Sequence, residues 1–287
     1  MNDKLTIEAR GLGIEYYNHK VFELLADLND FYDFLSDSCC NMADGCLITG
    51  KFSVNSNIYS SIQGTIESIK ILVFAGRLND AFALTRKFED AIYADLYTNI
   101  LLQQDEHKIV NPKESVKKIW DESIVRKWVL DGYILWGKKK KGETLLTIKR
   151  KIKEVDPELG ILFEDAKKNS DNRKVCNDNV HYNSWETFAI NDFHYLSGTR
   201  KGIELLNDLY GIILRFFVYH FSYTYIQRGF IYGSYDYIND LEEGLEPEPN
   251  SQYWIASIVQ DLFDKYIKTE YNTIAQYLIN KGMMNLK

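Results

Sequence analysis

Proline is scarce in this chain, with 4 residues among 287. Average usage of roughly 5% would give roughly 14. Because proline interrupts helix interiors and marks loops, its scarcity favours long helices and argues against a β-sandwich with many turns. The four prolines also stand at expected boundaries. Pro112 is at a helix start, Pro157 is between two helices, and Pro247 and Pro249 are in a late loop.

Apolar residues recur at three- and four-residue steps through most of the chain, which is the helical period. The expected helices span residues 17–42, 57–74, 79–102, 112–135, 145–155, 158–168, 202–227 and 251–279. Gly76 suits a helix C-cap and Asn79 suits the next N-cap. Strands do not alternate with helices and no repeat is visible, so Rossmann, barrel and solenoid folds are excluded. We predict an all-α protein with one domain over residues 1–287, built as an elongated up-and-down helical bundle.

The charge balance and the cysteines bear on partners and location. The net charge is -7, from 34 basic and 41 acidic residues, which disfavours a passive nucleic-acid coat. Residues 1–20 lack the apolar core of a signal peptide. The most apolar stretch, 205–226, contains Asp208, Arg215 and His220, so it predicts a buried helix and no membrane span. Four cysteines in a chain of this length give no disulfide framework, and we expect a cytoplasmic protein.

Motifs for cofactors and metals are missing from the sequence. It has no P-loop, dinucleotide fingerprint, HExxH or EF-hand loop. Cys39, Cys40 and Cys46 do not follow zinc-ligand spacing, and no second cysteine pair exists. Helical Glu-x-x-His pairs, which di-metal bundles use, are also missing. We therefore expect neither a metal nor a cofactor.

A lysine run is the strongest local charge feature. It consists of Lys138, Lys139, Lys140 and Lys141. Four more basic residues follow by position 153, which gives eight in this part of an acidic chain. One interpretation is a solvated loop. The other is a tab that contacts phosphates of a polyanion.

Two segments carry a resemblance to a known family, and the first is GRLNDAFALTRKFEDAIYADLYTNIL, residues 76–101. It resembles the helix of HEPN-like proteins, many of them uncharacterised or phage-defence proteins, that carries an Arg-x-x-x-Glu core pattern. The matching positions are Arg86 with either Glu89, three residues later, or Asp90, four residues later. From the residues alone, a structural ion pair at these positions is the alternative to a catalytic role.

The second segment is RKVCNDNVHYN, residues 173–183, which resembles the Arg-x(4–6)-His motif of HEPN ribonucleases. His181 fits the histidine and Asn177 fits the polar residue after the arginine, but Cys176 stands where the arginine is expected. Arg173 precedes the histidine by eight residues and Lys174 by seven. Eight residues on a helix are close to two turns, so Arg173 can return to the same face.

The resemblance implies a HEPN-like helical core at about 53–228, with extra helices at 14–45 and 251–281. It also implies a homodimer and metal-independent RNA cleavage. Histidine is a suitable base for attack by the ribose 2′-OH, and a cation stabilises the phosphate charge. The candidate catalytic residues are His181, Arg173 and Asn177, and the candidate RNA contacts are Lys174, Asp178, Lys138, Lys139, Lys140 and Lys141.

Two functional hypotheses remain open. The first is a cytoplasmic ribonuclease in a toxin or phage-defence role, with an antitoxin as a further partner. The second is a catalytically degenerate module that binds RNA, a nucleotide or another protein, which Cys176 in the arginine position supports. A third interpretation of His181 is a hydrogen-bonded structural histidine. The many aromatic residues belong mostly to the core, and a few can stack bases, although the sequence does not select which.

Overall fold

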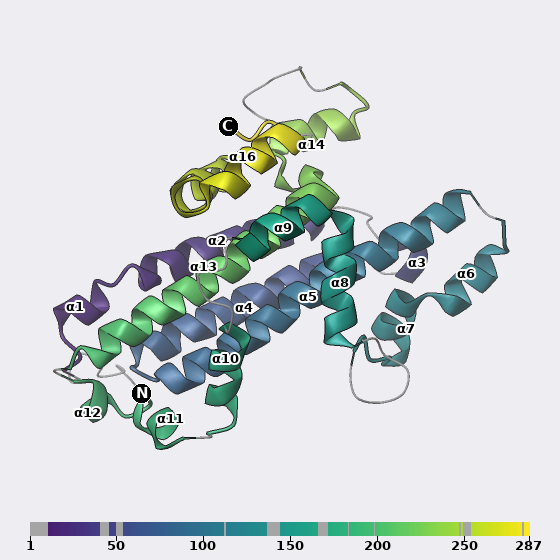
Figure 1. Ribbon diagram of the computed structural model, residues 1–287. Coiled ribbons are helices and arrows are strands. Elements are labelled where there is room, and N and C mark those ends of the chain that lie inside the picture. The colour runs from purple at the N-terminus through teal and green to yellow at the C-terminus, as the bar shows by residue number, and fades with distance from the viewer. Residues whose placement is uncertain are drawn as a thin grey trace, which may run out of the picture. The chain divides into compact units, whose positions relative to one another are not determined.

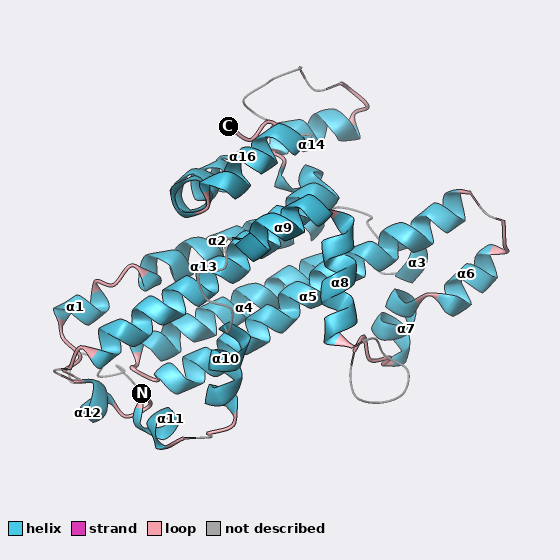
Figure 2. Ribbon diagram, viewed as in Figure 1, coloured by secondary structure: helices cyan, strands magenta, loops and turns pink. Residues whose placement is uncertain are grey.

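The computed structural model describes residues 11–40, 46–49, 54–111, 113–136, 144–165, 172–182, 184–197, 199–246, 248, 254–282 and 284–287. Helices make up most of this part of the chain, and no β-strand occurs in it (Figures 1 and 2). The predicted all-α helical bundle is therefore confirmed. None of the described helices is long and apolar enough to cross a membrane.

The chain divides into two compact units. Unit 1 comprises residues 1–33, 60–90 and 167–217, and unit 2 comprises the remaining three stretches, 34–59, 91–166 and 218–287. The division falls within four long helices, each of which supplies residues to both units. They are α2 (Val21–Cys40), α4 (Val54–Phe74), α5 (Leu78–Val110) and α13 (Lys201–Arg228). The single domain expected from the sequence stays a prediction.

Unit 1 adds four short helices to its parts of the long ones. They are α1 (Ile14–Tyr17), α10 (Asn172–Val180), α11 (Trp185–Ala189) and α12 (Phe193–Leu196). Aromatic rings fill its core, with Phe31 edge-on to Phe217 at 5.4 Å between centroids. Gly76 ends α4 with φ +70°, as a C-cap glycine should, and a Cβ there would lie 2.9 Å from a Leu12 methyl.

The third helix differs from its prediction at both ends. α5 begins at Leu78, so Asn79 lies inside its first turn and is not the N-cap. The Asn79 side chain binds α10 instead, as described below. The helix continues to Val110 rather than ending near residue 102. Its extension is polar and mostly exposed, which is why apolar spacing gave no sign of it.

Unit 2 contains the remaining helices. They are α3 (Cys46–Thr49), α6 (Val116–Glu122), α7 (Ile124–Asp131), α8 (Leu145–Val155), α9 (Pro157–Asp165), a 3₁₀ turn (Gly229–Tyr232), α14 (Tyr235–Glu242), α15 (Ser257–Leu262), a π-helical turn (Phe263–Lys268) and α16 (Asn272–Lys281). The predicted helix at 112–135 was wrong as one element. Buried Ser123 separates α6 from α7, because its hydroxyl accepts a hydrogen bond from the Arg126 N–H and caps a new helix.

Candidate functional site

α10 is held against the start of α5 by a buried pair of asparagines. Asn79 Nδ2 donates to the carbonyl oxygen of Asn179 at 3.0 Å and to its Oδ1 at 2.9 Å. Asn179 Nδ2 in turn donates to the Val175 carbonyl at 2.8 Å, one turn back along α10. These bonds satisfy polar groups that are costly to bury unpaired, so they fix where α10 sits along α5.

An ionic cluster joins the same two helices. Arg173 Nη1 donates to Glu89 Oε2 at 2.6 Å, and both Nη atoms of Arg173 lie 3.3 Å from Asp90 Oδ1. Arg86 forms an ion pair with Asp90, lies 3.7 Å from Glu89, and donates from Nε to Asn177 Oδ1 at 3.0 Å. Two guanidinium groups thus meet two carboxylates, which leaves the cluster close to neutral.

This cluster places five of the sequence-predicted residues together, namely Arg86, Glu89, Asp90, Arg173 and Asn177. Glu89 is only 3% exposed at its side chain, so its negative charge has lost most of its water and depends on the arginines. Arg173 and Asn177 lie one helical turn apart and both bind groups of α5. Their side chains connect the two helices rather than facing solvent.

Cys176 occupies the position where the family motif has an arginine, and its side chain is buried. Burial and, to a smaller extent, the nearby Glu89 charge raise the pKa of its thiol to about 12, while Arg86 acts in the opposite direction. A protonated, buried thiol is neither a nucleophile nor a metal ligand at neutral pH. Cys176 therefore serves as packing between α10 and α5.

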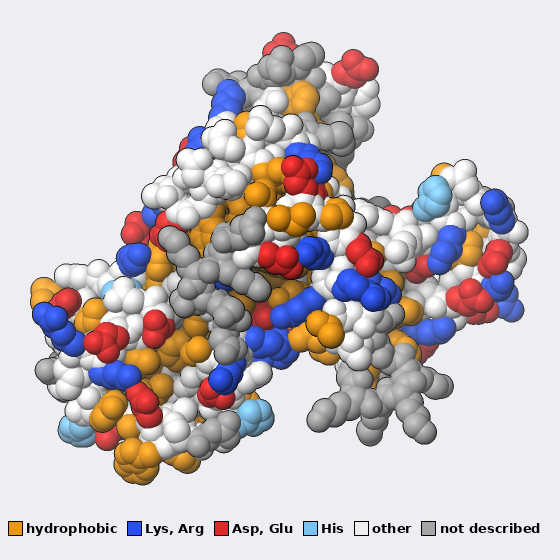
Figure 3. Space-filling view, in the orientation of Figure 1, with side chains coloured by type: hydrophobic (Ala, Val, Ile, Leu, Met, Phe, Trp, Pro, Cys, Tyr) orange, Lys and Arg blue, Asp and Glu red, His pale blue; other side chains and the backbone are white. Residues whose placement is uncertain are grey.

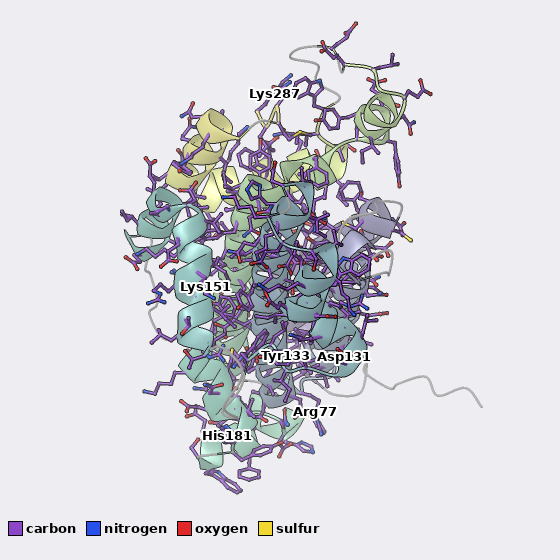
Figure 4. The ribbon with its side chains drawn as sticks, turned by 90° about the vertical axis from the view of Figure 1, so that its right-hand side faces the viewer. Arg77, Asp131, Tyr133, Lys151, His181 and Lys287 are labelled. Carbon is purple, nitrogen blue, oxygen red and sulfur yellow. The ribbon has the colours of Figure 1, made fainter. Side chains whose placement is uncertain are left out.

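The other candidate residues of α10 share a different side of the helix. Lys174, Asp178 and His181 follow at steps of four and three residues, a spacing that aligns side chains along one helical face. Lys174 and His181 are exposed, and Asp178 is half-buried. His181 lies in the turn directly after α10, toward the same end of unit 1 as Arg77 (Figure 4). The helix thus presents a cation and an imidazole on its outer side.

The lysine run from Lys138 to Lys141 lies outside the described residues. The cations that follow it on α8 are already engaged. Lys149 and Lys151 sit over the rings of Tyr93 and Tyr97, at 4.7 and 5.4 Å from the centroids. Arg150 and Lys153 pair with glutamates at 3.5 and 2.7 Å. In the described part of the chain, no three His, Cys, Asp or Glu side chains gather as a metal site.

Sequence reasoning missed a second polar cluster, which is buried in unit 2. At its centre is Asp95, which is 0% exposed and accepts hydrogen bonds from Asn55, Tyr59 and Asn99 at 3.1–3.2 Å. His220 Nε2 lies 3.0 Å from Asp95 Oδ2, and Arg228 donates to Asn99 Oδ1 at 3.0 Å. Polar residues on otherwise apolar helix faces were the available signal. Because every member is buried, the cluster contributes specificity to the core and offers no surface to a substrate.

These features define an all-α protein, and the exposed candidate residues of unit 1 lie on α10 and in the turn that follows it. Comparison of the chain with protein-family models, curated proteins and solved structures found no match. The resemblance to HEPN proteins therefore rests on the two sequence segments described above.

Proposed function

We propose that the protein is a HEPN-like, metal-independent endoribonuclease that acts as a toxin or in phage defence. The observation that carries the proposal is the position of His181, exposed at the end of α10 and in line with exposed Lys174. Histidine titrates near neutral pH, so an accessible imidazole can exchange protons with a bound RNA.

The reaction begins with the ribose 2′-OH, whose proton His181 accepts as the oxygen attacks the adjacent phosphorus. The bond from phosphorus to the 5′ oxygen breaks, and this oxygen takes up the proton that His181 accepted, directly or through water. The products are a 2′,3′-cyclic phosphate and a 5′-hydroxyl, and the imidazole is neutral again. Lys174 binds the phosphate and stabilises the charge that develops on it. We assign to Asp178, three residues before His181, the role of orienting the imidazole or contacting the RNA.

Arg173 and Asn177 take a positioning role in this proposal. Their hydrogen bonds to Glu89 and Arg86 hold α10 on α5, and so hold the end of α10 that carries His181. A guanidinium that faces two carboxylates and is partly buried is a poor phosphate ligand, so we assign the phosphate contact to Lys174, whose side chain is exposed.

The alternative function is RNA or nucleotide binding without cleavage, or binding of another protein. It is supported by Cys176, which is buried in the motif's arginine position, and by the engagement of Arg173 with Glu89 and Asp90. Under this alternative, neutralising Lys138 to Lys141 should weaken RNA binding.

The partners and location follow from the proposed function. We infer a homodimer, in which two copies of His181 serve one RNA site, a cytoplasmic location, and an antitoxin protein where the role is that of a toxin. Sedimentation velocity tests the dimer directly, since one species at twice the chain mass is expected.

The decisive experiment incubates the purified protein with total RNA in the presence of EDTA. The wild type should cleave, and His181→Ala should lose nearly all cleavage. His194→Ala is the matched control, because it removes another exposed histidine of unit 1. No cleavage by the wild type, or equal cleavage by His181→Ala, rules out the proposed mechanism. Salt-dependent binding without cleavage would favour the alternative.

A further inference from the structure

Three aromatic side chains form an exposed surface directly after His181. Tyr182 and Phe188 stack with their ring centroids 4.4 Å apart and their planes inclined by 20°. Trp185 lies 6.5 Å from Phe188 with an inclination of 32°. We call Tyr182, Trp185 and Phe188 the aromatic platform. Because the inclinations between the ring planes are small, the three side chains present ring faces rather than ring edges.

The aromatic platform is far more exposed than aromatic side chains usually are. Trp185 is 82% exposed, Phe188 52% and Tyr182 41%. Hydrophobic side chains gather on the molecular surface over α11 (Figure 3). Contiguous exposed apolar surface in a protein marks a place where something binds.

The backbone at Tyr182 supports the same conclusion. Its φ is +48°, the left-handed region that tyrosine rarely adopts and that glycine normally fills just after a helix. The conformation carries a cost, and it delivers the Tyr182 ring to Phe188. Because Tyr182 adopts this unfavourable backbone conformation and its ring makes an exposed contact, we infer that the ring has a function at the surface.

Hydrogen bonds hold the aromatic platform in place on both sides. Asn179 of α10 accepts a hydrogen bond from Asn79 of α5. The turn after α11 is bound to α5 as well, because the Asp80 N–H donates to Asn191 Oδ1 at 3.3 Å. Ser184 caps α11 by accepting from the Thr187 N–H. The backbone on both sides of the rings is therefore held before any ligand arrives, which lowers the entropic cost of binding.

We propose that the aromatic platform stacks bases of single-stranded RNA and thereby delivers the adjoining ribose and phosphate to His181. The proposal rests on the proposed function, since it names the form of RNA that the site takes. Stacking on aromatic rings is tolerant of sequence, because every base has a flat face. Exposed Lys174 supplies a cation for the phosphates of the RNA backbone. Lys201 of α13 lies 2.6 Å from Glu186 of α11 and offsets the negative charge beside the rings.

RNA is favoured over a protein partner because α10 and the segment that follows it carry each element of a single-strand site. The rings provide stacking faces, Lys174 provides a phosphate contact, and His181 provides the reactive group. A base can insert against Trp185 without displacing any other side chain, because that ring is largely open to solvent.

The test measures binding of an uncleavable 2′-O-methyl oligouridylate of about ten nucleotides, within the length range of single-strand sites. An abasic oligonucleotide of equal length supplies the same phosphates without bases. Trp185→Ala should weaken binding of the oligouridylate about tenfold and leave binding of the abasic strand unchanged. Trp120→Ala, which truncates a partly exposed tryptophan of α6, is the matched control and should bind like the wild type.

The possible results separate this proposal from the ribonuclease proposal. If Trp185→Ala binds the oligouridylate tenfold more weakly but the wild type cleaves no RNA, base stacking on the aromatic platform is supported and the ribonuclease proposal is rejected. If the wild type cleaves RNA but Trp185→Ala binds the oligouridylate as tightly as the wild type, the ribonuclease proposal is supported and base stacking is rejected. Equal affinity of the wild type for the two oligonucleotides overturns base stacking. A change in sedimentation of Trp185→Ala, with RNA affinity intact, overturns it in favour of an interface between two copies of the chain. Circular dichroism checks that each variant is folded.

Discussion

Arg173 and Glu89, 84 positions apart in the sequence, are joined by a 2.6 Å hydrogen bond between Nη1 and Oε2. The bond connects α10 to α5 at a carboxylate that is almost entirely buried. Because a buried carboxylate without its cation is strongly disfavoured, the position of α10 depends on Arg173. Arg173, a candidate catalytic residue in the sequence, thus holds α10 against α5.

Removing the Arg173 side chain should therefore destabilise the protein. We expect Arg173→Ala to lower the free energy of unfolding by about 2 kcal/mol, because the buried Glu89 carboxylate loses its 2.6 Å contact with Arg173 and Arg86 lies farther away, at 3.7 Å. Urea denaturation measures the change. Lys87→Ala, an exposed position on α5, is the control and should change stability by less than about 0.5 kcal/mol. Unaltered stability of Arg173→Ala would show that the ion pair is dispensable.

Lys174 should show the opposite behaviour to its neighbour. Lys174→Ala is expected to reduce RNA cleavage about 100-fold with little effect on unfolding, because the side chain is exposed. Lys174→Arg keeps a cation and should restore most of the rate. Initial rates on a short RNA measure the effect. Cleavage that survives Lys174→Ala but is lost in Arg173→Ala, with stability unchanged, would return the phosphate contact to Arg173.

Helix spacing predicted the fold well where one face is apolar. The expected helix at 57–74 corresponds to α4, Val54–Phe74, and Gly76 ends it as expected. The break between α6 and α7 was missed because Ser123 makes it by capping, without a glycine or a proline to announce it. The spacing of apolar residues indicates which helix face is buried, but it does not reveal a single hydroxyl that accepts a hydrogen bond from a backbone N–H.

The site was harder to predict because its contacts join distant parts of the chain. Spacing within one helix predicted that Arg86 pairs with either Glu89 or Asp90, and in the structure Arg86 contacts both. Nothing in the sequence indicated that Arg173 would compete for the same carboxylates. The aromatic platform was also hidden, since an aromatic residue usually packs in the core and only the structure distinguishes Trp185 from the buried rings.

Asp95 should be among the positions most sensitive to mutation. Asp95→Ala leaves His220, Tyr59 and two asparagines without their shared acceptor in a buried setting, so we expect a loss of about 3–5 kcal/mol. Thermal and urea unfolding measure it. Asp121→Ala makes the same change at an exposed position of α6 and should be nearly neutral. A loss below about 1 kcal/mol for Asp95→Ala would mean that the cluster adds little to stability.

The Asp156 carboxylate should make stability depend on pH in the acidic range. Burial raises its pKa, but hydrogen bonds from the Leu159 N–H, Tyr277 and Lys281 outweigh burial and hold the pKa below its usual value. The folded state therefore favours the charged form. Its contribution is complete above the unfolded pKa of about 3.9 and disappears as the pH falls through the lower folded value.

Asp156→Asn tests this dependence, because asparagine still caps α9 but cannot carry the charge. We expect the wild type to be about 1 kcal/mol more stable than Asp156→Asn at pH 7, with the difference vanishing near pH 2. Urea unfolding of both proteins between these pH values measures it. A constant difference over the whole range would show that the charge is not responsible.

Two substitutions at Tyr182 separate the cost of its left-handed backbone conformation from the effect of losing its ring. Tyr182→Ala and Tyr182→Gly both lose the stacking on Phe188, but only glycine adopts φ +48° without a steric cost. Tyr182→Gly should therefore be more stable than Tyr182→Ala by about 1 kcal/mol in urea unfolding. At Lys87, inside α5, the order should reverse, because glycine is the poorer helix residue by about 1 kcal/mol. If alanine is the more stable replacement at both positions, Tyr182 carries no left-handed strain, and the argument from its backbone to the aromatic platform is lost.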